Sequence, residues 1–288
     1  MISIIIPLYN KELSIAKTIF SVLSQSYTNF ELLIVDDGST DQSATVVNGI
    51  LDERINLLVK ENGGVSSARN TGVHAAKYEW ISFLDADDLW HIDFLKNIVE
   101  VIEEQKEVQV ITTDYETRTS NGDVIKSYIA NKKGYVDFFA VTNEIGFHIL
   151  NMSTFCVRKS TLIQTGLFSI DITHGEDMEV FEKLARLHQI YLIDKVLSYY
   201  IHDAENRASY NLPNPKKTRV YQVDTIEIVS IHEEKYQKDR ILVYLHEYFV
   251  QRKLKYLIQL YTKHSNFVSM GDITSYVFKR LRFKVLKN

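Results

Sequence analysis

Residues 81–90, ISFLDADDLW, join an apolar run to a cluster of three carboxylates, Asp85, Asp87 and Asp88. An apolar run of this length is typical of a strand in the middle of a sheet. Carboxylates crowded this closely repel one another and resist desolvation, so such a cluster usually persists where a cation or a reacting proton needs it. The stretch therefore predicts a central strand with a polar site at its carboxyl end.

Strand-like and helix-like segments alternate through the first part of the chain. The other apolar runs are ISIIIPLY (2–9), FELLIVDD (30–37), INLLV (55–59) and VQVITT (108–113). Between them, residues 15–23 and 94–102 carry apolar side chains at helical spacing. This alternation predicts an α/β fold in which a mostly parallel, Rossmann-like sheet is flanked by helices on both faces.

Polar residues follow three of these runs at the points where the strands are expected to end. PLYN (7–10) closes the first run, DDGSTD (36–41) the second and DADD (85–88) the fourth. In open α/β sheets, ligands bind beyond the carboxyl ends of the strands. Because three separate segments deliver polar groups to one edge, we expect a binding site there.

The DADD segment has the chemistry of a site for a hard divalent cation. Asp85 and Asp87 are two positions apart, so an extended backbone would point both side chains to the same side. Mg²⁺ and Mn²⁺ typically take one or two protein carboxylates and complete their shell with phosphate oxygens and water, which implies a diphosphate ligand. An EF-hand calcium loop would need a glycine where Trp90 stands. Helix capping explains one carboxylate but not three, and we expect Asp88 to shape the turn.

Three other segments carry candidate functional residues, and each of these residues also has an ordinary structural interpretation. GGVSSARNTG (63–72) combines two glycines, a helix start and Arg69, which suits an anion cradle or an ordinary helix N-terminus. HGEDMEVFEKL (174–184) places Asp177 at a helix start, where a carboxylate also stabilises the helix dipole. His202 lies in a polar loop, and a lone histidine is usually incidental. The dinucleotide and P-loop glycine motifs are absent from the sequence.

Composition bounds the class of protein. The 288 residues have a net charge of −4 and a pI near 6.2, so nothing attracts the whole chain to nucleic acid. A single cysteine, Cys156, excludes an internal disulfide and leaves a reducing cytoplasm as the expected compartment. No apolar run approaches the ~18 to 20 residues that a membrane helix needs.

The second half of the chain predicts a different organisation. Asn121-Gly122 indicates a hairpin turn, and Pro213 and Pro215 mark a linker. We therefore expect a main domain over 1–212 and a helical extension over 213–288. The extension carries an apolar stripe that suits either a core or a partner interface, formed by Val250, Leu254, Leu257, Ile258 and Tyr261.

The end of this extension is strongly basic. Residues 273–288, ITSYVFKRLRFKVLKN, contain five basic residues and no acid, interleaved with aromatic and aliphatic residues. This pattern is typical of a segment that rests on an anionic membrane surface, and a solvated helix end is the alternative.

Taken in order, IIIPLYN, FELLIVDDGSTD, NGGVSSARNTG, WISFLDADD and GEDMEVFEKL resemble the motifs of the family 2 glycosyltransferases of the GT-A fold. The resemblance covers about residues 1–210 and is closest in the first hundred. It implies a metal-dependent, inverting transfer of a sugar from a nucleotide diphosphate sugar, such as UDP-hexose or UDP-N-acetylhexosamine. The implied acceptor is a hydroxyl of a glycan or lipid-linked glycan in surface polysaccharide synthesis.

The resemblance also implies roles for individual residues. Pro7, Tyr9 and Asp37 would hold the base, with Tyr9 stacking on it, and Arg69 would lie near the diphosphate. Asp85 would lie near the ribose and the metal, and Asp87 would bind Mn²⁺ or Mg²⁺, with His202 as a further ligand. Asp177 would be the general base.

Two alternatives remain open. A sugar nucleotidyltransferase also needs a nucleotide and a metal, but it would ordinarily show a glycine- and lysine-rich loop near the N-terminus. A noncatalytic member of the fold would bind a sugar nucleotide, or a partner through its helical extension. The presence of both Asp87 and Asp177 in the sequence favours a catalytic member of the family over a noncatalytic one.

Overall fold

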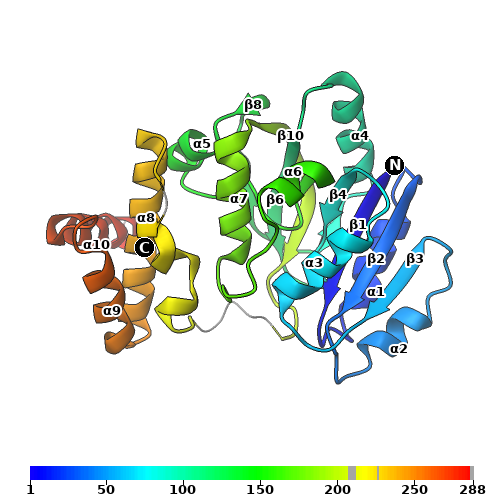
Figure 1. Ribbon diagram of the computed structural model, residues 1–288, viewed down its shortest axis with the longest axis horizontal. Coiled ribbons are helices and arrows are strands. Elements are labelled where there is room, and N and C mark those ends of the chain that lie inside the picture. The colour runs from blue at the N-terminus through cyan, green and yellow to red at the C-terminus, as the bar shows by residue number, and fades with distance from the viewer. Residues whose placement is uncertain (207–211, 226, 286–288) are drawn as a thin grey trace. The chain divides into compact units, whose positions relative to one another are not determined.

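The computed structural model describes residues 1–206, 212–225 and 227–285, with the side chains of the last helix described as far as Val277. The chain forms two compact units, one of residues 1–170 and 177–208 and the other of residues 171–176 and 209–288 (Figure 1). The strands are β1 (Ile2–Leu8), β2 (Phe30–Asp36), β3 (Ile55–Val59), β4 (Trp80–Phe83), β5 (Leu89–Trp90), β6 (Val110–Arg118), β7 (Val124–Tyr128), β8 (Gly134–Val136), β9 (Phe155–Arg158) and β10 (Ile190–Ile201). Helices α1 to α7 accompany them: α1 (Ile15–Leu23), α2 (Ser43–Asn48), α3 (Val65–Ala75), α4 (Phe94–Glu104), α5 (Phe138–Ile145), α6 (Lys159–Gln164) and α7 (Glu176–Leu187).

One sheet organises the first unit, in the order β3-β2-β1-β4-β9-β6-β10-β5. The neighbours β3, β2, β1 and β4 pair in parallel, as the alternating pattern predicts. Beyond β4 the sheet is mixed, because β9 lies antiparallel between β4 and β6. The predicted α/β class is confirmed, and the antiparallel strand is a feature that the alternating pattern did not indicate.

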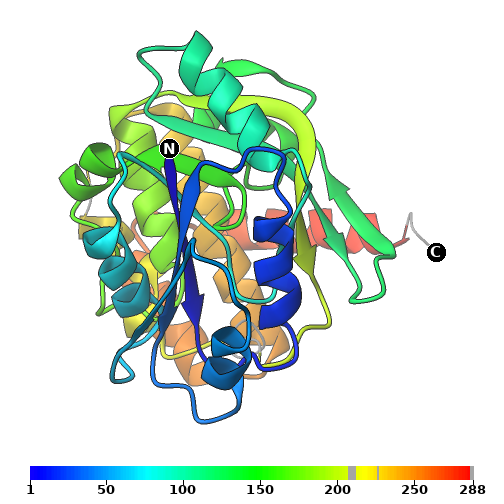
Figure 2. The same ribbon diagram turned by 90° about the vertical axis from the view of Figure 1, so that its right-hand side faces the viewer.

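Helices cover both faces of this sheet (Figures 1 and 2). The even-numbered residues of β1 lie in one apolar core with α1, α2 and α4. On the opposite face, α3 packs so closely that a Cβ added at Gly72 would lie 2.5 Å from Cγ2 of Ile5. On that face, Phe181 of α7 packs edge-on against Phe155 of β9, with ring centroids 5.1 Å apart. β1 is therefore buried on both sides, which explains its continuous apolar run.

The predicted hairpin is present in the first unit. β6 and β7 pair antiparallel, and Gly122 in the turn between them has a φ of 95°, a conformation that glycine adopts without steric cost.

The second unit is helical. Its described residues form two short 3₁₀ segments (Pro215–Lys217 and Arg219–Thr225) and the helices α8 (Ile231–Val250), α9 (Leu254–His264) and α10 (Met270–Val285). Its core gathers residues of α8 and α9 around Tyr248, which is fully buried. Among the residues that the structure describes, no helix is long and apolar enough to cross a bilayer.

The predicted stripe over residues 250–261 is wrong as a single buried face. α8 ends at Val250 and α9 begins at Leu254, and the backbone between them turns at Arg252, whose φ is 55°. The break changes the helical phase, so Val250, Leu254 and Ile258 are 58 %, 58 % and 61 % exposed. Leu257 and Tyr261 do pack against the helical core.

Candidate active site

The DADD segment forms a turn rather than an extended strand end. β4 stops at Phe83, and the amide of Asp88 donates to the carbonyl of Asp85 over 3.0 Å. The expectation that an extended backbone points Asp85 and Asp87 to one side is therefore wrong. Each of these two carboxylates instead meets a different basic side chain.

Those basic side chains are Arg69 and Lys11. The guanidinium of Arg69, on α3, lies 3.0 Å from Oδ1 of Asp85, and the ammonium of Lys11 lies 2.6 Å from Oδ2 of Asp87. Burial raises the pKa of Asp87, Lys11 opposes this rise, and the charge of Asp85 adds to it. The crowded acids thus have charge compensation within the chain itself, a possibility that the sequence argument did not consider.

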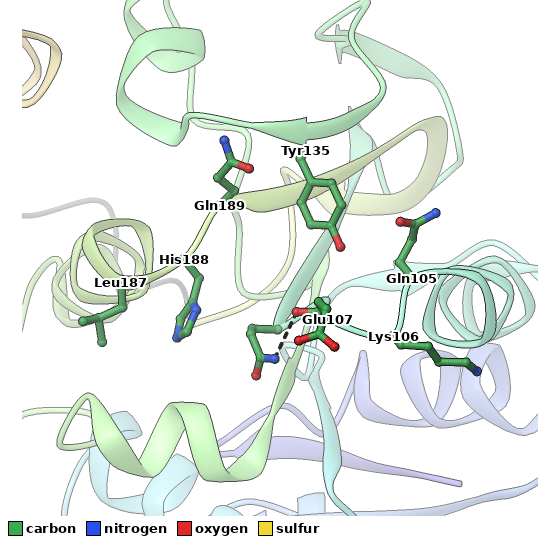
Figure 3. Close-up of a pocket in the computed structure, with 8 residues that line it drawn as sticks. Gln105, Lys106, Glu107, Tyr135, Leu187, His188 and Gln189 are labelled. Carbon is green, nitrogen blue, oxygen red and sulfur yellow. Dashed lines mark hydrogen bonds between the residues drawn. The ribbon is translucent and has the colours of Figure 1, made fainter.

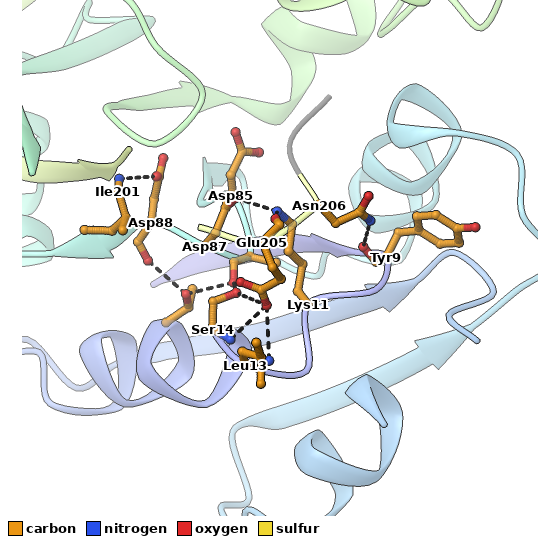
Figure 4. A network of polar contacts seen from close by, with 12 residues as sticks. Tyr9, Lys11, Leu13, Ser14, Asp85, Asp87, Asp88, Ile201, Glu205 and Asn206 are labelled. Carbon is orange, nitrogen blue, oxygen red and sulfur yellow. Dashed lines mark hydrogen bonds and ion pairs between the residues drawn. The ribbon is translucent and has the colours of Figure 1, made fainter. Parts of the chain in front are cut away.

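Asp88 has a structural position. Its fully buried carboxylate accepts from the hydroxyl of Ser153 at 2.5 Å and from the amide of Ile201 at 3.2 Å. Burial, followed by the charges of Asp87 and Asp85, raises the pKa of this carboxyl well above its usual value. Asp88 therefore ties the turn to the loop before β9 through Ser153. It also ties the turn to the end of β10 through Ile201 (Figure 4).

The residues expected to hold the base follow β1 and β2. Pro7 is buried in β1 beside Val35 of β2, whereas Tyr9 is 41 % exposed just past the strand. Asp37 is buried directly after β2, where its amide donates to the carbonyl of Leu8. The two strand ends are therefore held side by side.

The carboxylate of Asp37 is itself the anion bound by the glycine loop. It accepts from the amide of Gly63 at 3.0 Å and of Gly64 at 2.7 Å, and the ammonium of Lys60 lies 2.6 Å away. Two of the amides predicted to cradle a phosphate thus bind a side chain of the same unit. This arrangement positions Asp37 and the start of α3.

Asp177 lies half-buried in the first turn of α7, where its Oδ1 accepts from the amide of Met178 at 2.7 Å. Only His188 and Gln189 separate the end of α7 from the start of β10, and α7 runs antiparallel to β10, so its first turn points towards the carboxyl ends of the strands (Figure 1). β10 runs parallel to β6, and both β6 and β4 are antiparallel to β9, so β10 has the direction of β4 and β1. The first turn of α7 therefore lies at the same edge of the sheet as the DADD turn (Figure 1).

His202 follows β10 at this edge, with an exposed side chain and its amide bonded to the carbonyl of Arg118 at 2.8 Å. Across residues 1–206, 212–225 and 227–285, no three histidine, cysteine, aspartate or glutamate side chains gather as a ready-made metal site. His202 is thus not joined to Asp85 and Asp87 in one ligand cluster.

Sequence reasoning missed Lys11 and Glu205. The ammonium of Lys11 also donates to the backbone carbonyl of Glu205. The carboxylate of Glu205 accepts from the amides of Leu13 and Ser14, both at 3.1 Å, and from the hydroxyl of Ser14 at 3.0 Å (Figure 4). The only available signal was a basic residue directly after the polar end of the first strand.

A separate depression of about 520 Å³ lies at the opposite edge of the sheet (Figure 3). It is lined by the loop between α4 and β6, by Tyr135 of β8, and by the last residue of α7 with the turn that leads to β10. Its single lysine and single glutamate offset each other, so it lacks the acid cluster of the carboxyl edge.

A sheet flanked by helices, with acids gathered at its carboxyl edge, is the arrangement expected of the GT-A fold. The sequence profile of Glycosyl transferase family 2 matches residues 3–160, more than half of the chain. The chain therefore belongs to glycosyltransferase family 2.

Individual proteins agree with this assignment. Over 200 residues the chain is 29 % identical to the glycosyltransferase GlyG of Streptococcus pneumoniae, covering 67 % of this chain and 65 % of GlyG. Over 195 residues it is 31 % identical to the Escherichia coli UDP-Glc:alpha-D-GlcNAc-diphosphoundecaprenol beta-1,3-glucosyltransferase WfgD, covering 67 % of this chain and 73 % of WfgD. The crystal structure of Staphylococcus aureus TarS 1–349 with UDP-GlcNAc has the same fold, with a TM-score of 0.74 at 20 % identity over 92 % of this chain and 80 % of TarS 1–349.

Proposed function

We propose that the chain is an inverting glycosyltransferase that moves a hexose or N-acetylhexosamine from a UDP-sugar to a hydroxyl of a glycan or lipid-linked glycan in surface polysaccharide synthesis. The observation that carries the proposal is the meeting of the DADD turn, the ends of β1 and β2 and the first turn of α7 at one sheet edge. The named donor and acceptor of WfgD and the UDP-GlcNAc of the TarS structure support the substrate class.

Asp177 is the proposed general base. A carboxylate opposite the leaving group accepts the proton of the attacking hydroxyl, and attack from that side inverts the anomeric carbon. Asp177 comes from α7, whereas the acids of the DADD turn follow β4. The base and the leaving-group site are therefore supplied by different elements at this edge of the sheet.

The donor is proposed to bind at the ends of β1 and β2. The exposed ring of Tyr9 offers a stacking surface for uracil, and Pro7 and Asp37 support the loop around it. Arg69, only 4 % exposed and held by Asp85, supplies positive charge towards the diphosphate. Together these groups orient the nucleotide before chemistry.

Asp87, Asp85 and His202 are the proposed ligands of Mn²⁺ or Mg²⁺. The two carboxylates fit, because these cations use few protein carboxylates, and Lys11 and Arg69 each engage one oxygen of the two acids. Within the described residues, His202 does not gather with them, so its role as a further ligand is the part of the proposal that this geometry does not support. A bound cation would act as a Lewis acid that stabilises the negative charge of the departing diphosphate.

A donor screen tests this function. The chain is incubated with UDP-glucose, UDP-GlcNAc, GDP-mannose or dTDP-glucose, with Mn²⁺ or with EDTA, and thermal unfolding and nucleotide release are followed. We expect protection and release with a UDP-sugar only, increased by Mn²⁺ and by a GlcNAc-diphospho-lipid acceptor. Protection by none of the four donors would contradict the proposal.

We further propose a cytoplasmic location with peripheral contact to an anionic membrane through residues 273–288. The support is the basic and apolar composition of this segment. Within it, the structure describes the side chains of residues 273–277, and the five basic residues lie beyond them.

A further inference from the structure

Lys11, which the sequence motifs did not indicate, stands where the proposed divalent cation is expected to bind. Its ammonium lies 2.6 Å from Oδ2 of Asp87, the proposed metal ligand. The side chains of Lys11 and Asp87 are only 11 % and 15 % exposed, so water screens their interaction weakly. A divalent cation that approaches Asp87 must therefore compete with Lys11.

The surroundings of Lys11 hold its ammonium next to Asp87. The backbone carbonyl that accepts from its ammonium belongs to Glu205, and the Glu205 carboxylate is anchored on Leu13 and Ser14 at the start of α1. An ammonium has three donors. Within the described residues, Asp87 and the Glu205 carbonyl take two of them, which leaves a third for a ligand oxygen.

We propose that Lys11 exchanges between Asp87 and the diphosphate of the donor, and so makes cation binding depend on the diphosphate. This inference rests on the proposed function. Without a diphosphate, Lys11 neutralises Asp87 and opposes the cation. When the diphosphate binds, its oxygens attract the ammonium, and Asp87 becomes available to the cation.

Two affinities of the full chain test the exchange, each compared between the wild type and Lys11→Met. The first is the affinity for Mn²⁺ alone, measured by calorimetry. The second is the affinity for UDP in EDTA. The exchange predicts that the variant binds Mn²⁺ at least about 5-fold more tightly and UDP at least about 5-fold more weakly, the lower end of usual coupling between two ligands.

Matched controls separate this effect from general damage. Lys17→Met removes an exposed lysine from α1 and is expected to leave both affinities unchanged. Uridine, which lacks phosphates, is expected to bind the wild type and Lys11→Met equally. Lys11→Gln serves as a second variant if Lys11→Met unfolds. Measuring the Mn²⁺ affinity at pH 7 and at pH 8.5 distinguishes competition by the ammonium of Lys11 from competition by a proton on Asp87.

Unchanged or weaker Mn²⁺ binding by Lys11→Met at both pH values would overturn the exchange, as would unchanged UDP binding in EDTA. The proposed function fails differently. If the wild type binds UDP equally in Mn²⁺ and in EDTA, the metal role of Asp87 is wrong. A loss of UDP affinity in Lys11→Met would then still support the contact between Lys11 and the diphosphate.

Discussion

Replacing the buried carboxylate of Asp88 tests how the turn of the site is held. Asp88→Ala removes the acceptor of two buried donors, the hydroxyl of Ser153 and the amide of Ile201. A buried donor left without a partner costs about 1–3 kcal/mol. The hydroxyl of Ser153 can rotate towards another acceptor, whereas the amide of Ile201 cannot, so the hydroxyl contributes less to the cost. We therefore expect the free energy of unfolding to fall by about 2–4 kcal/mol.

Asp88→Asn separates the hydrogen bonds from the charge. The amide oxygen can still accept from Ile201, and the amide nitrogen can donate to the hydroxyl of Ser153. Because the folded-state pKa of Asp88 is raised, its stabilising contribution is complete below the usual value of 3.8 and is lost as the pH rises through the raised pKa. The advantage of the variant over the wild type should therefore grow with pH across that window, by at most about 1.4 kcal/mol per pH unit.

Urea unfolding monitored by tryptophan fluorescence provides the assay. Trp80 and Trp90 are the two tryptophans of the chain, and both lie in the unit that contains Asp88. An Asp88→Ala cost below about 0.5 kcal/mol, the usual range of a surface substitution, would refute the anchoring role. A difference between Asp88→Asn and the wild type that stays constant or shrinks with rising pH would refute the electrostatic argument.

Three further predictions address the donor site, the packing and the membrane. Tyr9→Ala should weaken UDP binding by about 1–3 kcal/mol through lost stacking while leaving the thermal unfolding temperature nearly unchanged, and an unaltered UDP affinity by calorimetry would count against the stacking role. Gly72→Ala should lower the free energy of unfolding by about 1–3 kcal/mol, because its Cβ would lie 2.5 Å from Ile5, whereas Gly49→Ala meets nothing closer than 3.4 Å and serves as the control in the same denaturation series. Liposomes with anionic lipid should bind the chain more weakly once the five basic residues of 273–288 are replaced by glutamine, and equal binding in a flotation assay would rule out this membrane contact.

Local sequence patterns predicted the strands that are marked by an apolar run and a polar end of their own. The apolar runs before Asp37 and Asp85 indicated buried strands, and polar residues after them marked the binding edge. The insertion of β9 between β4 and β6 could not be predicted, because strand neighbours depend on pairing between distant segments.

The compensating charges were hidden for the same reason. Lys11 and Asp87 are 76 positions apart, so their ion pair exists only in the folded chain. The site residues could be chosen by type and strand position, but their partners could not. The turn at 85–88 also depends on Ser153, which ordinary periodicity does not connect to it.

The most direct test of the central claim is sugar transfer by Asp177→Asn, compared with the wild type and with Asp171→Asn, a substitution of an exposed aspartate that precedes α7. With UDP-glucose or UDP-GlcNAc and a GlcNAc-diphospho-lipid acceptor, the account predicts that Asp177→Asn binds UDP and Mn²⁺ like the wild type but loses transfer by about 10²- to 10⁴-fold. Asp171→Asn should retain transfer. Turnover by Asp177→Asn at the wild-type rate would contradict the assignment of Asp177 as the base.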